Sequence, residues 1–198
     1  MNKIETYKQF ERKTNYKDIF DAVSDGNHSE LEKYIKQKND INIQNTNGMS
    51  LLMLSIKNDN YYMANLLLDN DIDINLKDNI DGENAIYYTI NKSIFSGVNN
   101  KFINRLIDMN IDITNNAYFL ILHMLIEDKT NISIEILYKI IDNGYDMFTK
   151  NHEGENTWEY TDTKIPFYNE KIFNKLKLRY PDKYYHFLVL KKSTKFNL

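Results

Sequence analysis

A short recurring phrase, an aspartate followed by an aliphatic and usually a polar residue, limits the fold of this chain more than any other feature. It occurs at Asp40-Ile41-Asn42 and Asp73-Ile74-Asn75, with looser copies at Asp112-Ile113-Thr114 and Asp146-Met147-Phe148. The four aspartates are 33, 39 and 34 residues apart. A period of this length is typical of a chain built from stacked supersecondary units rather than around one globular core.

Each phrase follows an apolar run whose spacing places its members on one helix face. The runs are Leu31, Tyr34 and Ile35; Met63, Leu66, Leu67 and Leu68; Phe102, Ile103, Leu106 and Ile107; and Ile136, Leu137, Ile140 and Ile141. A second recurring segment lies upstream, where Gly48-Met49-Ser50-Leu51-Leu52 returns 34 residues later as Gly82-Glu83-Asn84-Ala85-Ile86. The 198 residues include only 6 Gly and 2 Pro, fewer than an all-β chain needs for its turns. The unit is therefore predicted to be a turn, a short helix and a second helix.

This pattern resembles the ankyrin repeat. Ser50 stands at the family's Thr position, where a hydroxyl caps the first helix, and Leu52 stands at its Leu position. Ala22 and Gly26 match the small helix residue and the glycine between the helices, and Leu122-His123 matches the Leu-His pair.

The chain departs from the family pattern at several places. No repeat contains the full Thr-Pro-Leu-His, and Asp59 replaces the glycine between the helices. The third repeat carries about six additional residues, placed around Ser93–Asn100, and the fourth lacks an Asp-x-x-Gly turn.

The resemblance implies an all-α fold, an ankyrin-repeat solenoid of about five helix-turn-helix units with short hairpin loops. We predict a lead-in over 1–14, a repeat domain over 15–181, and a C-terminal tail over 182–198 that caps the last repeat. The units are predicted at 15–44, 45–77, 78–114, 115–148 and 149–181.

Neither catalytic nor metal-binding chemistry is indicated. The chain has no cysteine, and His28, His123, His152 and His186 show no metal-ligand spacing. The acidic run 69–73 resembles a calcium loop but lacks the required glycine and the terminal glutamate. We predict a protein that is not an enzyme and that uses neither a cofactor nor a metal.

The net charge of −3 offers no basic excess, which argues against a nucleic-acid partner. The N-terminus has no apolar signal-peptide region, and no run approaches the length of a membrane span. We expect no membrane partner and a cytoplasmic location, in the producing cell or in a host cell. The abundance of Asn, Ile, Lys and Tyr indicates an AT-rich genome, microbial or viral.

The resemblance also implies a binding face, because ankyrin arrays bind partners through the concave face made by hairpin tips and first helices. Placing the repeats in phase predicts this set of contact residues: Gln44, Thr46, Asn47, Met49, Lys57, Asp78, Ile80, Asp81, Glu83, Asn91, Lys150, His152, Glu153 and Glu155. Met49 and Ile80 are predicted to be apolar residues exposed at tips. The five carboxylates in the set favour a partner with a basic surface.

The predicted function is a non-catalytic protein–protein interaction module that binds another protein and blocks or scaffolds it. Host interaction, toxin immunity and anti-defence are all open as its purpose. The alternative is a structural or assembly protein that self-associates through the last repeat and the tail. If the chain is an interaction module, we expect it to be monomeric on its own.

Overall fold

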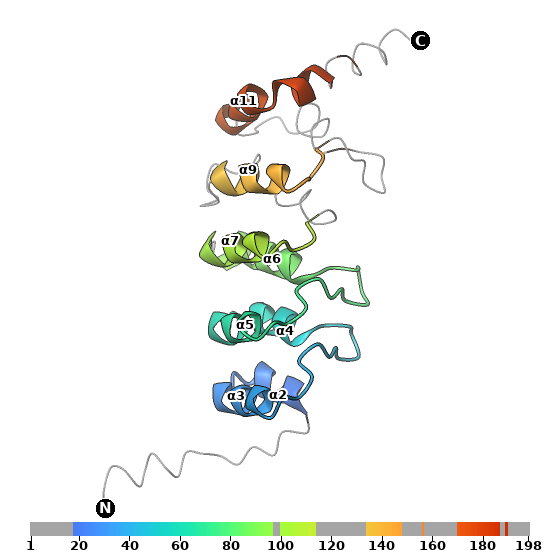
Figure 1. Ribbon diagram of the computed structural model, residues 1–198, viewed down its shortest axis with the longest axis vertical. Coiled ribbons are helices and arrows are strands. Elements are labelled where there is room, and N and C mark those ends of the chain that lie inside the picture. The colour runs from blue at the N-terminus through green and yellow to red at the C-terminus, as the bar shows by residue number, and fades with distance from the viewer. Residues whose placement is uncertain are drawn as a thin grey trace, which may run out of the picture. The chain divides into compact units, whose positions relative to one another are not determined.

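The computed structural model describes residues 18–96, 100–113, 134–147, 156, 170–186 and 189 (Figure 1). In these ranges the chain consists of helices joined by turns, and an isolated antiparallel bridge pairs Gln44 with Ser50. The chain divides into two compact units, Met1–Ile72 and Asp73–Leu198.

The first unit contains two helical hairpins. Helices α2 (Ile19–Ser24) and α3 (His28–Lys36) form one, and α4 (Leu51–Lys57) and α5 (Tyr61–Leu68) form the other. The hairpins contact each other through α2 with α4 and through α3 with α5. Each hairpin thus buries its apolar face against the equivalent helices of its neighbour.

A polar side chain caps the start of each of these four helices, where backbone N–H groups have no partner within the helix. The cap oxygens accept N–H groups three residues ahead, as listed here: Asp18 from Asp21, Asn27 from Glu30, Ser50 from Met53, and Asn60 from Met63. The predicted role of Ser50 as a helix cap is confirmed.

The turn between the two helices of a hairpin requires a left-handed residue. Gly26 has φ +70°, and Asp59, the residue that replaces the family's glycine, has φ +56°. Aspartate tolerates this region better than most residues because its short side chain bonds locally. The replacement therefore keeps the turn.

A residue with a left-handed backbone conformation also follows the second helix of each hairpin, as is common at the C-terminal end of a helix. It lies two residues before each recurring aspartate, and its occupants are Lys38, Asp71, Asn110 and Gly144, with φ of 57°, 58°, 59° and 100°. The recurring phrase thus marks a recurring backbone conformation.

The core of the first unit is formed by apolar side chains from all four helices. Leu31, Leu52, Ile56 and Leu67 are fully buried. Ser55, at a position where the family has a small residue, is also fully buried, and its hydroxyl donates to the carbonyl of Leu51 at 2.8 Å. This buried polar group is therefore satisfied.

The second unit contains α6 (Ala85–Ser96), α7 (Asn100–Asp108), α9 (Ile134–Asp142) and α11 (Glu170–Arg179). Helix α6 packs on α7, and α7 packs on α9. Helix α6 has 12 residues where α4 has 7, so part of the predicted additional sequence lengthens this helix.

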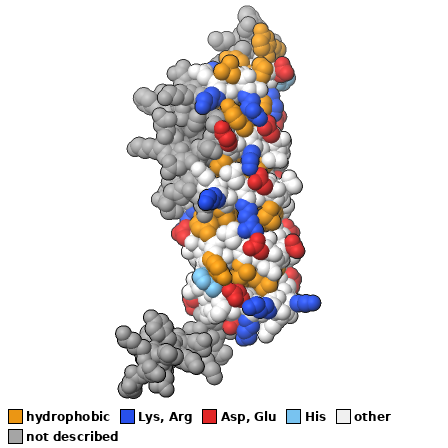
Figure 2. Space-filling model, turned by 60° about the vertical axis from the view of Figure 1, so that its left-hand side comes forward, with side chains coloured by type: hydrophobic (Ala, Val, Ile, Leu, Met, Phe, Trp, Pro, Cys, Tyr) orange, Lys and Arg blue, Asp and Glu red, His pale blue; other side chains and the backbone are white. Residues whose placement is uncertain are grey.

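Charged pairs connect neighbouring second helices in this unit. Lys139 on α9 lies 2.7 Å from Asp108 on α7. Arg179 on α11 lies 2.9 Å from Asp142 on α9 and stacks 4.3 Å from the ring of Tyr138. Figure 2 shows acidic and basic side chains interspersed on one face, so this face presents no field of a single sign.

The five-unit division of the sequence stays a prediction. The segments expected to form the first helices of the fourth and fifth units lie outside the described residues, as does the lead-in. In the tail, residues 181–186 are helical and Val189 is 58% exposed. The role of the tail as a cap of the last repeat also stays a prediction.

Replacing Ser50 by alanine tests the capping argument. We expect Ser50→Ala to lower the free energy of unfolding by about 1 kcal/mol, because the N–H of Met53 loses its acceptor in a buried setting. Urea denaturation measures the change. The control is Ser24→Ala, which alters an exposed serine at the end of α2. Equal effects of the two substitutions on stability would contradict the capping role of Ser50.

Candidate functional site

The hairpin tip of the second unit, residues 78–83, is organised around one carboxylate. The Oδ1 atom of Asp78 accepts backbone N–H groups from Ile80, Asp81, Gly82 and Glu83 at 3.1, 3.0, 3.0 and 3.3 Å. The backbone N–H of Asp78 donates to the carbonyl of Glu83 at 2.9 Å. The loop thus closes on its own aspartate, which fixes its backbone.

The second oxygen of Asp78 accepts the hydroxyl of Tyr88 on α6 at 2.6 Å. Burial raises the pKa of Asp78, but the hydrogen bonds from Tyr88 and from the backbone outweigh burial and hold this pKa below its usual value. Asp78 is 7% exposed and ionised at neutral pH, and its charge is used inside the loop rather than offered to a partner.

The base of the tip is bonded to the turn that follows α7. The side-chain amide of Asn84 donates to the carbonyl of Asp112 at 2.7 Å, and Asn75 accepts the N–H of Asp112 at 2.7 Å. Lys77 lies 3.6 Å from the carboxylate of Asp112. Two successive turns of this unit are therefore held together by polar contacts.

Three side chains of the tip, Asn79, Ile80 and Asp81, face solvent. Ile80 is 66% exposed, an unusual exposure for a branched apolar residue, and Asp81 beside it is also exposed. Because the backbone beneath them is fixed, they are presented in a defined position. A partner that binds here loses little entropy in ordering the loop.

Glu83 has a different environment. Its side chain is half-buried, and its Oε2 atom is buried without a hydrogen-bond partner among the described residues. Burial, followed by the charges of Asp78 and Asp81, raises the pKa of Glu83 to about 7, and Lys77 opposes the shift.

The tip of the first unit is built on Asn45, which lies 33 residues before Asp78. The Oδ1 atom of Asn45 accepts the N–H groups of Asn47 and Met49 at 3.0 Å each, and Gly48 donates to the Asn45 carbonyl at 2.8 Å. The side-chain amide of Gln44 donates to the carbonyl of Gly48. This tip is one residue shorter than 78–83, and Met49 occupies the position that Glu83 takes there.

The predicted exposure is wrong for two members of the contact set. Met49 is 3% and Asp78 7% exposed, because the tip folds both side chains inward. Glu83 and Asn91 are half-buried, and the exposed members are Gln44, Thr46, Asn47, Lys57, Ile80 and Asp81. Lys150, His152, Glu153 and Glu155 lie outside the described residues. The partner-binding role of the set stays a prediction.

The sequence prediction missed Tyr88 and Asn84, which hold the tip in place. The sequence contained a signal for Tyr88 but not for Asn84. Once the repeats are in phase, an aspartate at the start of a tip needs a donor from the first turns of the following helix, and Tyr88 supplies a hydroxyl there. The partner of Asn84 lies 28 residues ahead and depends on the packing of the next turn.

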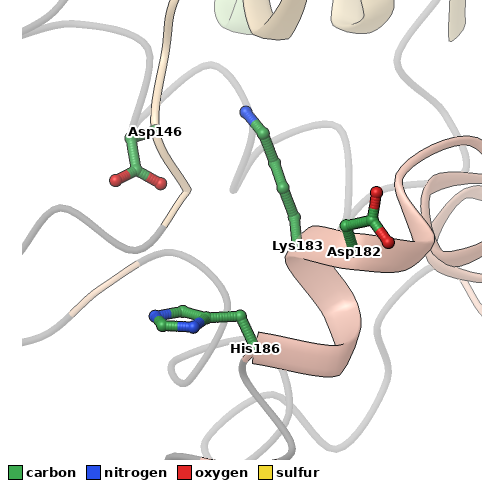
Figure 3. Close-up of a pocket in the computed structure, with 4 residues that line it drawn as sticks. All are labelled: Asp146, Asp182, Lys183 and His186. Carbon is green, nitrogen blue, oxygen red and sulfur yellow. The ribbon is translucent and has the colours of Figure 1, made fainter.

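A pocket of about 430 Å³ lies near the C-terminal helices, lined by Asp146, Asp182, Lys183 and His186 (Figure 3). Asp182, Lys183 and His186 come from helical residues 181–186, and their side chains do not converge on one point. In the part of the chain that the structure describes, no three His, Cys, Asp or Glu side chains come together to hold a metal ion. The described helices are also all too short or too polar to cross a bilayer.

The fold and the tips define the class of protein. The family model for ankyrin repeats, in three copies, matches residues 19–117, half of the chain. The chain belongs to the ankyrin-repeat family, and the predicted all-α fold is confirmed. A comparison with curated proteins finds no match. Ankyrin repeats generally serve as protein–protein interaction modules and are typically non-catalytic.

Asp78→Asn tests the carboxylate at the centre of the tip. We expect the free energy of unfolding to fall by about 1–3 kcal/mol, because an amide has one acceptor oxygen where the carboxylate has two. Either the hydroxyl of Tyr88 or the backbone N–H groups of the loop then lose their acceptor. Asp81→Asn, an exposed neighbour, is the matched control and should change stability by less than about 0.5 kcal/mol. Equal losses would contradict the assigned role of Asp78.

Glu83→Gln tests the half-buried carboxyl. A folded-state pKa of about 7, above the ordinary 4.5, means that this group costs stability as the pH rises from about 4.5 to 7. The variant should therefore be more stable than the parent at pH 8, on the order of 1 kcal/mol after solvent screening, with the difference vanishing below pH 4.5. Thermal unfolding of the variant and the parent across this pH range measures the difference in stability. A difference that does not change with pH would contradict the raised pKa of Glu83.

Proposed function

We propose that this protein binds another protein and acts by occupying or holding its surface, with the 78–83 tip as a principal contact. The observation that carries the proposal is the exposure of Ile80 next to Asp81 on a loop fixed by Asp78. A monomer gains nothing from presenting an apolar side chain on a rigid, solvent-facing tip.

The chemistry of the tip favours a basic partner surface. Asp81 and Glu83 supply carboxyl groups beside Ile80, so a partner with a lysine or arginine next to an apolar recess is complementary in both charge and shape. The tip of the first unit is polar, with Thr46 and Asn47 exposed and suited to hydrogen bonding.

Substitution at the tip tests the proposal once a partner has been captured. Ile80→Asp and Asp81→Lys are each expected to lower affinity at least tenfold, and Asp81→Lys should also flatten its dependence on salt. The control is Glu135→Lys, which makes the same charge reversal at an exposed residue of α9. The proposed contact is wrong if the tip variants bind as the parent does, or if the control loses as much affinity.

Self-association is the second candidate. It is supported by Leu178 and Tyr185, which are 82% and 70% exposed near the C-terminal end of the described chain. Light scattering over a range of protein concentrations distinguishes self-association from a protein that is monomeric on its own. A mass that doubles with concentration, and returns to that of a monomer in Leu178→Asp, favours self-association.

A further inference from the structure

Glu83 occupies a position that the tip itself encloses. In the first unit the equivalent residue is Met49, which is 3% exposed. Both side chains follow the tip glycine, Gly48 or Gly82, and both backbone N–H groups are taken by the residue that begins the tip. A carboxyl group therefore stands where the same geometry buries a thioether side chain in the neighbouring tip.

The groups described around Glu83 are mostly acidic or neutral. The carboxylates of Asp78 and Asp81 are on the same loop, and the phenol groups of Tyr87 and Tyr88 approach it from α6, where its charge helps to raise their pKa values. Among the described residues, the cation that acts on Glu83 is Lys77, which lies 3.6 Å from Asp112. The buried Oε2 atom thus lacks both a donor and a dedicated counter-ion among the described residues.

A carboxyl oxygen that is buried without a donor favours the neutral form of the group, whereas a cation in contact with the group favours the anion. We propose that Glu83 recognises a lysine or arginine side chain of the partner, and that below neutral pH it carries a proton in the free protein which it releases when that side chain binds. This inference rests on the proposed function.

The step balances in charge and atoms. The O–H bond of the Glu83 carboxyl breaks, its proton passes to solvent, and the remaining carboxylate pairs with the ammonium or guanidinium of the partner. Asp81, which is exposed, contributes longer-range attraction, whereas Glu83 discriminates because its desolvated anion needs a cation in contact.

Proton release couples binding to pH. With a free-state pKa of about 7, the competent anion is a small fraction of the protein at pH 6 and most of it at pH 8. Affinity for a cationic ligand should therefore rise about tenfold between these two pH values. Folding is not the cause, because the same group slightly destabilises the free protein over that range.

The test uses the full chain and an N-acetylated pentalysine peptide, whose charge does not change between pH 6 and pH 8. The amide resonances of residues 80–83 are followed by NMR during titration at both pH values. The parent and Glu135→Gln, the matched control, should bind about tenfold more tightly at pH 8. Glu83→Gln, which preserves the size of the side chain, should bind weakly at both pH values with no such change.

The outcomes separate the two proposals. If pentalysine shifts the tip amides equally well at both pH values, or if Glu83→Gln keeps the pH dependence, proton-linked recognition by Glu83 is overturned while a basic partner surface still stands. If pentalysine leaves residues 80–83 unperturbed at both pH values, the basic partner surface fails, and the inference fails with it.

Discussion

The structure depends on one constraint, which is that a two-helix hairpin of this size cannot bury its apolar face by itself. In the first unit the solution is visible in the contacts of α2 with α4 and of α3 with α5, which enclose Leu31, Leu52 and Leu67 completely. The hairpins must therefore repeat with the same turn conformations. This explains why a left-handed residue recurs after α3, α5, α7 and α9 even where it is Lys38 or Asp71 rather than glycine.

The tips obey a local rule of the same kind. Each of the two described tips begins with an Asn or Asp whose side-chain oxygen accepts backbone N–H groups of its own loop, so the loop holds its own backbone in place. Because the loop is held this way, the side chains mounted on it can vary without loss of the fold. Met49 and Glu83 stand at one position of this frame, and the exchange converts a packing residue into a half-buried carboxyl. Differences between repeats thus change the chemistry of a tip without changing its backbone.

Sequence reasoning succeeded where the determinant is local. The cap at Ser50 follows from a hydroxyl before an apolar helical run, and the turn at Asp59 follows from its phase in the repeat. It failed for Met49 and Asp78, which were assigned to the exposed surface by position alone. Both lie at the tip in sequence, but the hydrogen bonds of the loop turn them inward. Counting residues in a repeat gives position along the chain and not the direction of a side chain.

What the sequence by itself determined is the family, the helical class and the period, because each arises from short-range patterns: apolar spacing, caps and the recurring aspartate. The tertiary structure alone decided the chemical character of the tip. It showed that Asp78 is used internally, that Ile80 and Asp81 are presented to solvent, and that Glu83 is desolvated beside two carboxylates. The physical reason is that exposure and pKa depend on what surrounds a group in space, and the groups that surround Glu83 come from both the tip and α6.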